Sequence, residues 1–345
     1  MRIIKYSIYA LFVLFFASRC SKKNDGGNVT PAPVVTPTPT PGTNASLVSL
    51  PAGWKKSINY LSTNTNDMEV YVFDSIYAGR PAKMFCFAYS ANNTSYEFKP
   101  VLSTTTEKRP TQFYAEESGQ IFACINGGYF GTGQSFSLVK YNNTVSAANI
   151  KSVTRTLSGV NTAYYPTRAA FGFSSTGNTP DVSWIYHVGA GNDLIYSYPN
   201  PAPNLLNTAP AAQPTASFPT GGAEWRVHSA IGGSPMLIKN GTINITDAQE
   251  LISINNTTSR PRTAIGYNAS NTIFLMAVEG DNPTGAAGLN LTELAQLMKD
   301  FGCVGAINLD GGGSTNMIIN NRSTVRPGDA GVERPVMSVI FIKRK

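Results

Sequence analysis

Short apolar segments that end in glycine recur along this chain, and they constrain its fold more than any other feature. Residues 121–130, 230–235 and 305–314 each hold an apolar run that is followed by two or three glycines. Such a run is long enough for one buried strand, and glycine is typical of the turn that ends it. Many short strands with few helical patterns predict an α+β fold with mixed or antiparallel sheets, rather than a parallel doubly wound sheet.

One helix is indicated over residues 290–301. Apolar residues recur there at helical spacing, and Asn290 with Glu293 forms a capping pair at its start. Gly302 follows as a stop signal. The helix would deliver the chain into the apolar run that precedes Asp310.

The first residues predict export and attachment to a membrane. Residues 1–19 have the pattern of a signal peptide, with a positive start and an apolar run too short to cross a bilayer. Ala17-Ser18-Arg19-Cys20 resembles a bacterial lipoprotein cleavage site, so Cys20 is the expected lipidation site; ordinary signal cleavage is the alternative. The lipidated cysteine and the proline-rich stretch after it, residues 20–46, predict an extended tether. We therefore expect a cell-envelope lipoprotein, at the outer membrane or the cell surface.

Two regions are expected after the tether. Residues 47–114 have strand composition and predict a β-rich N-terminal region, either packed on the rest of the protein or separate. Residues 115–345 contain all the glycine-rich strand ends and predict the main domain. The candidate chemistry therefore falls in the second region.

Composition narrows the class of function. Removing the three basic residues of the signal peptide from the 27 in the chain leaves 24, against 20 acidic residues. No basic cluster is interleaved with aromatic residues, so nucleic acid is not an expected partner. Charged residues make up only 14% of the chain, which suits an extracytoplasmic protein that binds polar, sugar-like material. The three cysteines beyond Cys20 show no metal-ligand spacing and read as small buried apolar residues.

The segment 305–314 carries the strongest candidate for chemistry. Asp310 stands where the apolar run ends, and Gly311, Gly312, Gly313 and Ser314 follow it. Glycines let a substrate approach the backbone closely, and their N–H groups can line a site for an anion. The alternative is a glycine-rich hairpin turn with Asp310 as an ordinary turn residue.

Polar residues also stand at the ends of other predicted strands. Arg262 leads into one strand and offers a planar fork of donors for a phosphate or carboxylate, with a structural ion pair as the alternative. Glu279 and Asp281 follow another apolar run. The remaining candidates for substrate binding flank the glycine pairs or the arginine: Asn126, Gly127, Gly128, Gly232, Gly233, Ser234 and Thr263. A hairpin turn is the alternative for the Asn126-Gly127 pair.

Four of these segments, in their order and spacing, resemble the phosphodiester glycosidase family. They are Asn126–Phe130, Ile231–Pro235, Arg262–Gly266 and Asn308–Ser314, and the similarity covers roughly residues 115–342. The resemblance implies hydrolysis of a sugar-1-phosphodiester, with α-linked N-acetylglucosamine as the sugar in the animal member. This chain has Val278-Glu279-Gly280 where the family commonly has Val-Asp-Gly.

Hydrolysis at an anomeric carbon commonly uses two carboxyl groups. We expect Asp310 to act as nucleophile or base and Glu279 as the second carboxylate, with Asp281 in reserve. Arg262 and the glycine N–H groups would stabilise the leaving phosphate. A metal requirement stays open, because acidic and amide side chains can also hold Ca²⁺ or Mg²⁺ through oxygen ligands.

Two functions are compatible with this sequence. The first is a surface-anchored glycoside hydrolase that acts on sugar-phosphate diesters. The second is a non-catalytic lipoprotein that binds glycans, which would rely on aromatic platforms and need no aligned arginine and carboxylates. The strand-end carboxylates favour the enzyme. If the protein is this enzyme, we expect one pocket to bring together Asn126, residues 231–234, Arg262, Glu279 and Asp310.

Overall fold

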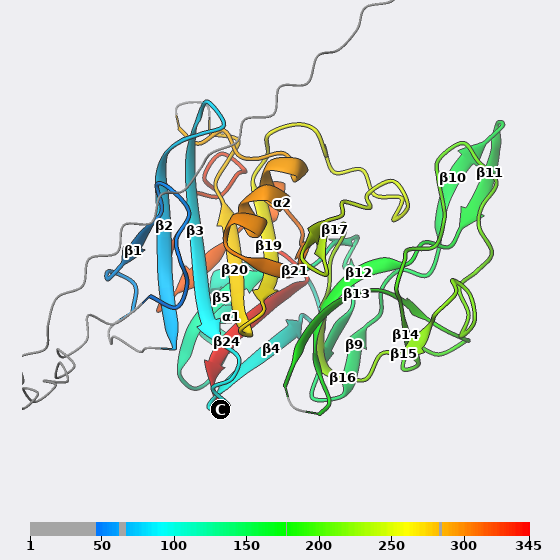
Figure 1. Ribbon diagram of the computed structural model, residues 1–345, viewed down its shortest axis with the longest axis horizontal. Helices are drawn as coiled ribbons and strands as arrows, with labels where there is room; N and C mark the ends of the chain where they lie inside the picture. The colour runs from blue at the N-terminus through cyan, green and yellow to red at the C-terminus, as the bar shows by residue number, and fades with distance from the viewer. Residues whose placement is uncertain (1–45, 62–66, 177, 283–284) are drawn as a thin grey trace, which may run out of the picture. The chain divides into compact units, whose positions relative to one another are not determined.

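Antiparallel sheets form the framework of the structure (Figure 1). It is a computed structural model that describes residues 46–61, 67–176, 178–282 and 285–345. The expected signal peptide, Cys20 and almost all of the proline-rich tether lie outside the described residues, so their predictions stay predictions. Within these ranges no helix is both long enough and apolar enough to cross a membrane.

The largest sheet has eight strands, in the order β1-β2-β3-β20-β19-β21-β17-β18. The neighbours β20, β19 and β21 are central to the site, because their ends carry three of the predicted functional residues. The bounds are β1 Lys55–Ser57, β2 Met68–Tyr77, β3 Arg80–Ser90, β20 Thr272–Val278, β19 Arg262–Asn268, β21 Cys303–Asn308, β17 Met236–Lys239 and β18 Thr242–Ile243.

Two further sheets complete the core. The five-stranded sheet contains β23 Arg322–Ser323, β22 Met317–Ile319, β5 Ile121–Asn126, β24 Ser338–Arg344 and β4 Tyr96–Leu102, in this order. The seven-stranded sheet contains β15 Ala223–Glu224, β14 Ile195–Tyr198, β13 Pro180–His187, β12 Arg168–Ser174, β16 Val227–Gly232, β8 Val139–Tyr141 and β9 Thr144–Ala147, again in order.

Smaller elements complete the described residues. Two short hairpins pair β10 Val153–Leu157 with β11 Val160–Tyr164, and β6 Phe130–Gly131 with β7 Gln134–Ser135. The helices are α1 Pro110–Glu116, α2 Leu291–Asp300 and a single 3₁₀ turn at Gly312–Ser314. The predicted β-rich α+β class is therefore confirmed, and every strand pair among the described residues is antiparallel.

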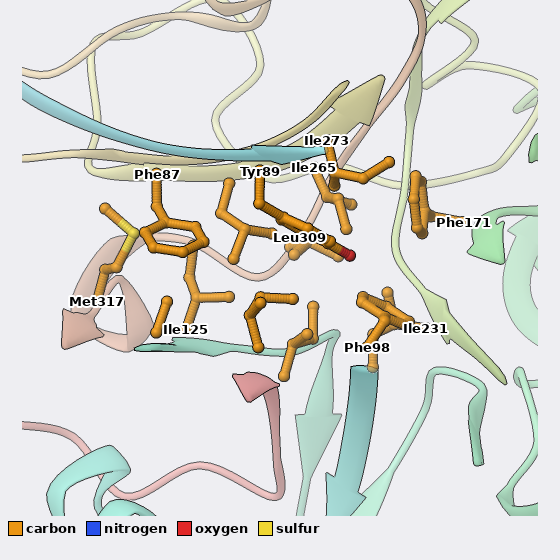
Figure 2. Close-up of a cluster of buried hydrophobic side chains, with 14 of the residues drawn as sticks. Phe87, Tyr89, Phe98, Ile125, Phe171, Ile231, Ile265, Ile273, Leu309 and Met317 are labelled. Atoms are coloured by element: carbon orange, nitrogen blue, oxygen red, sulfur yellow. The ribbon is translucent and has the colours of Figure 1, made fainter. Parts of the chain in front are cut away.

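Strand β20 explains why the eight-stranded sheet is buried on both faces. Successive side chains of a strand point to opposite faces. Ile273 and Leu275 enter a core that they share with the other two sheets, whereas Phe274 and Met276 pack beneath α2. Figure 2 shows the shared core, in which side chains from the three sheets point toward one another. A strand with two buried faces reads as a continuous apolar run, as β20 does.

Helix α2 starts and ends where its sequence predicts. The Asn290 side chain accepts a hydrogen bond from the Glu293 N–H at 2.8 Å, and the Glu293 carboxylate accepts one from the Asn290 N–H at 3.0 Å. Gly302 follows with φ +81°, a left-handed conformation that favours glycine. The helix covers one face of the large sheet and hands the chain directly to β21.

Residues 47–114 are built into the same sheets as the rest of the protein. Strand β3 pairs with β20 along seven residues, and β4 pairs with β24 along seven. Both pairings join the N-terminal region to strands more than 150 positions away in the sequence. The expected division at residue 114 therefore falls inside one folded unit, and the alternative of a separate N-terminal region is excluded.

Candidate active site

Strand ends from all three sheets meet beside Asp310, and glycines make this close approach possible. A Cβ on Gly128 would lie 2.3 Å from the Gly232 carbonyl oxygen, and one on Gly233 would lie 2.2 Å from the Asn308 carbonyl oxygen. These distances exclude any side chain, so the two glycine pairs serve backbone packing. Gly127, Gly128, Gly232 and Gly233, which were expected to contact substrate, do not line the cavity that Asp310 borders.

A cavity of about 170 Å³ opens at this junction. It includes four predicted site residues, Arg262, Asp310, Gly311 and Gly312, together with four that were not predicted there: Tyr129, Ile254, Asn255 and Arg260. Gly312 has φ +60° and open space where a Cβ would be. It is the position in this glycine run where a ligand can reach the backbone.

The backbone of Asp310 is held from two directions. Its N–H donates to the Gly127 carbonyl at 3.2 Å, and its own carbonyl accepts from Asn126 Nδ2 at 2.8 Å. Its carboxylate Oδ1 accepts the Gly311 N–H at 2.9 Å. These contacts join the end of β21 to the end of β5, so the carboxyl group is placed by two sheets at once.

The environment of Asp310 changes its acidity. Desolvation raises the pKa of this carboxyl from 3.8 to about 6, against lowering contributions from the Ser314 hydroxyl, the Gly311 N–H and Arg334. Burial disfavours the charged form, whereas donors and cations favour it. The Ser314 hydroxyl lies close enough to act on this pKa, yet it has no hydrogen-bond partner of normal geometry among the described residues. A carboxyl that titrates near neutral pH in a cavity is suited to catalysis.

Asn126 and Thr263 support the site from behind and do not line the cavity. Both are buried. Asn126 Oδ1 accepts from Thr263 Oγ1 at 2.9 Å and from the Asn316 N–H at 3.1 Å, while its amide nitrogen holds the Asp310 carbonyl. The predicted contact of Asn126 and Thr263 with substrate is therefore replaced by a positioning role.

Arg262 lines the cavity, but most of its donors are used within the protein. Nε donates to the Leu289 carbonyl at 2.9 Å and Nη1 to the Ile254 carbonyl at 3.0 Å. Nη2 donates to the carbonyls of Asn255 at 2.7 Å and Thr258 at 3.1 Å. Four of the five N–H bonds of a guanidinium are thus occupied. Arg262 holds the 254–258 segment as a wall of the cavity.

Glu279 does not share the cavity with Asp310. Its carboxylate is buried, and it accepts the Arg326 N–H at 3.0 Å and Asn282 Nδ2 at 3.2 Å. It faces a different cavity, which Asp74 and Lys83 also line. The structure therefore does not bring Glu279 and Asp310 together in one cavity, as the expected pair of carboxylates requires. A strand-end carboxylate can instead satisfy a neighbouring loop.

The reserve candidate Asp281 lies at the rim. Its carboxylate Oδ1 is 3.2 Å from Arg260 Nη1, and Asp281 itself has φ +51°. It is not among the residues that line the cavity with Asp310. Asp281 therefore contacts the cavity only indirectly, by pairing with Arg260, which lines it.

Ser234 belongs to a buried network around a carboxylate that sequence patterns did not indicate. Glu250 is fully buried and accepts from five donors: Ala169 N, Trp184 Nε1, Met236 N, Thr246 Oγ1 and Ser234 Oγ. A carboxylate satisfied in this way fixes the turn after β16 against β12 and β13. A lone glutamate in a polar stretch carries no local signal for such a role.

The Tyr129 hydroxyl makes three hydrogen bonds in the cavity wall. Its hydroxyl lies 2.6 Å from the Ser234 carbonyl and 3.1 Å from the Leu309 carbonyl, and it accepts from Asn308 Nδ2 at 2.6 Å. Desolvation and the nearby Asp310 charge raise the pKa of this phenol well above its usual value. Tyr129 therefore stays protonated and ties β21 to the turn at Ser234.

Gly313 lies on the side of the glycine-rich loop that faces Asp329. A Cβ on Gly313 would lie 2.3 Å from Asp329 Oδ1, which pairs with Arg334. Among the described residues, no group of three or more His, Cys, Asp or Glu side chains is arranged to hold a metal ion. The acidic residues considered for Ca²⁺ or Mg²⁺ are separated, with Asp310 in one cavity and Glu279 in another.

A carboxyl with a raised pKa, two arginines and a half-buried phenol share one cavity at the junction of three antiparallel sheets. This combination defines an enzyme-like site for an anionic ligand. A family model described as phosphodiester glycosidase matches residues 123–343, which is more than half of the chain. The chain belongs to the phosphodiester glycosidase family.

Relatives with this activity in their names match over a shorter stretch. The N-acetylglucosamine-1-phosphodiester α-N-acetylglucosaminidase of Bos taurus is 34% identical over 109 residues, which is 29% of this chain and 20% of that protein. The Mus musculus protein of the same name is 34% identical over 109 residues, covering 29% and 21%. The chain therefore matches about a fifth of the length of these relatives.

Solved structures share the fold over most of the chain. The zebrafish N-acetylglucosamine-1-phosphodiester α-N-acetylglucosaminidase catalytic domain, auto-inhibited by its pro-peptide, has a TM-score of 0.56 at 18% identity and covers 85% of this chain and 89% of its own. A hypothetical protein from Synechocystis has a TM-score of 0.53 at 15% identity and covers 86% and 69%. At these identities the likeness concerns the fold.

Proposed function

We propose that this protein hydrolyses a sugar-1-phosphodiester, releasing the free sugar and a phosphomonoester. The supporting observation is that Asp310, with a pKa of about 6, shares a cavity with Arg260 and Arg262. Family membership supports the same class of reaction. N-acetylglucosamine is the sugar to test first, because it appears in the names of the relatives.

The chemistry follows from one carboxylate and a cationic wall. The bond between the anomeric carbon and the phosphate oxygen breaks, its electron pair stays on the phosphate, and a water hydroxyl ends on the anomeric carbon. A phosphate is already a good leaving group, so charge stabilisation matters more than protonation. Asp310 in its ionised form attacks the anomeric carbon or takes the proton of the attacking water. The arginines offset the charge that develops on the phosphate.

We also propose that the enzyme is anchored to the cell envelope through Cys20. The support comes from the sequence alone: a short apolar signal, a cysteine at its end and a proline-rich tether. Labelling cells with a radioactive fatty acid should label the wild type but not a Cys20→Ser variant. Release of an unlabelled wild type into the medium would contradict the anchor.

The activity is tested with the methyl phosphodiester of N-acetylglucosamine 1-phosphate. We expect Asp310→Asn to lower kcat by about 10²-fold or more, which is about 3 kcal/mol of transition-state stabilisation. The substitution keeps the size of the side chain and its capacity to accept the Gly311 N–H, but it removes the charge. Asp193→Asn is the matched control, because Asp193 is exposed and does not line the cavity.

The same assay can reject the proposal. A folded Asp310→Asn variant that turns over at the wild-type rate would remove Asp310 from the reaction. A wild type that cleaves no sugar-phosphate diester, with or without added divalent cations, but binds glycans would favour the binding protein instead.

A further inference from the structure

The two arginines in the cavity wall differ in how much of each is available to a ligand. Arg262 is 2% exposed, and four of its N–H bonds point to backbone carbonyls. The Arg260 side chain is 42% exposed and pairs with Asp281 at 3.2 Å. A phosphate needs two adjacent free N–H groups for bidentate binding. Arg262 has one left, so Arg260 is the arginine that can supply them.

The backbone below Arg260 is rigid, although its guanidinium is exposed. Its N–H donates to the Leu289 carbonyl at 3.1 Å, and its carbonyl accepts the Leu289 N–H at 3.0 Å. Gly288, with φ +86°, packs so closely that a Cβ there would lie 2.3 Å from the Arg260 carbonyl oxygen. A fixed backbone limits the volume that the side chain explores, so less freedom is lost when it binds a ligand.

We propose that Arg260 binds the phosphate of the substrate and that Asp281 holds its guanidinium in the cavity wall until the phosphate replaces the carboxylate. This assignment rests on the proposed function, and it moves the anion-binding role from Arg262 to its neighbour two residues earlier. An ion pair between two partly exposed groups is weak, whereas a bidentate pair with phosphate is strong and directional. Replacement of the Asp281 carboxylate by the substrate phosphate on Arg260 is therefore favourable.

The ion pair also sets the affinity for the anion. While Asp281 is bound, it competes with the phosphate for the same N–H groups. Asp281 lies outside the residues that line the cavity, so its replacement leaves the space around Asp310 unchanged. Removing its charge should strengthen phosphate binding, and removing Arg260 should weaken it. Opposite effects from two partners are not expected if the pair only stabilises the fold.

The test compares Arg260→Ala, Arg260→Gln, Arg260→Lys and Asp281→Asn in the full chain. We expect Arg260→Ala to raise KM for the methyl phosphodiester about tenfold or more, and to lower kcat as well, because the same guanidinium offsets the charge that develops on the leaving phosphate. The inhibition constant of inorganic phosphate should rise in parallel. Arg260→Lys should give values of both constants between those of the wild type and Arg260→Ala, because lysine keeps the charge but loses the planar pair of N–H donors. Asp281→Asn should lower both constants by about threefold.

Arg226→Ala serves as the control, because Arg226 is 77% exposed and pairs with Glu224 away from the cavity. Its KM and phosphate inhibition should stay at wild-type values. If Arg260→Ala does not fold, as judged by circular dichroism and thermal melting, Arg260→Gln provides the same comparison with a side chain of similar length.

Failure of the inference and failure of the proposed function give different results. If the wild type hydrolyses the diester and the Arg260→Ala and Arg260→Gln variants both keep its KM and phosphate inhibition within twofold, Arg260 is not the phosphate ligand. If the wild type hydrolyses no diester, calorimetry with inorganic phosphate measures the site directly. Binding that Arg260→Ala weakens about tenfold then supports the assignment without the activity, and unchanged or undetectable binding overturns it.

Discussion

The ends of β20 and β21 look alike in the sequence, and the structure uses them differently. Each strand is an apolar run with a carboxylate close behind it, Glu279 after β20 and Asp310 after β21. Glu279 accepts the Arg326 N–H and an amide of Asn282, so its charge is compensated inside the protein. Asp310 has a raised pKa and borders an open cavity. A carboxylate is available for reaction when the protein leaves some of its hydrogen-bonding capacity and its charge uncompensated.

Arg262 begins β19, the strand between these two ends, and its replacement should have the largest effect on stability. We expect Arg262→Lys to lower the free energy of unfolding by about 3 kcal/mol, because a lysine cannot reach all four carbonyls and each buried one left unpaired costs about 1–3 kcal/mol. Urea unfolding measures the change, with Arg226→Lys as the exposed control. An unchanged unfolding midpoint would mean that the 254–258 wall is held by other contacts.

Asp310→Asn should stabilise the fold while it removes activity. The pKa rises from 3.8 to about 6 in the folded protein, so the charged form is disfavoured there by about 3 kcal/mol, or about 2 kcal/mol for a partly exposed group. This cost is absent below pH 4, grows as the pH rises to about 6, and is complete above it. The variant should therefore exceed the wild type by about 2 kcal/mol at pH 7.5 and match it near pH 4. A constant difference across this range would separate the effect from ionisation of Asp310.

The same titration should shape the pH profile of catalysis. If Asp310 acts in its ionised form, kcat/KM falls about tenfold for each pH unit below about 6, or about 1.4 kcal/mol per unit. Steady-state kinetics between pH 4.5 and 8, in a single mixed buffer system, measure this fall of kcat/KM on the acid side. Glu279→Gln should keep the same fall, because Glu279 lies in another cavity. If the fall of kcat/KM at low pH disappears in Glu279→Gln, that fall belongs to Glu279 and not to Asp310.

Glu279→Gln should have the smallest effect. A glutamine keeps an oxygen for the Arg326 N–H, so we expect a loss of stability of about 1 kcal/mol or less and a kcat/KM within about threefold of the wild type. Thermal melting and the diester assay measure the two changes, with the parallel Asp310→Asn variant as the reference. A loss as large as that of Asp310→Asn would restore Glu279 as a partner in the reaction.

Local chemistry was enough to determine many elements of this protein from the sequence. The capping pair Asn290 and Glu293 and the stop at Gly302 predicted α2, and the apolar run of β20 predicted a strand. These signals are local because helix ends and strand periodicity depend on hydrogen bonds and side chains a few residues apart. The order of the glycine-rich motifs also led to the correct family.

Only the tertiary structure decided what each strand-end residue does. Asn126 and Asp310 are 184 positions apart, yet one hydrogen bond joins them, and Glu250 gathers donors from three other segments. The sequence pointed to Arg262 at the start of β19, and no pattern in it indicated Arg260 two positions earlier. Their difference lies in which carbonyls and carboxylates surround each guanidinium. That environment is assembled by contacts between distant segments, and no local pattern encodes it.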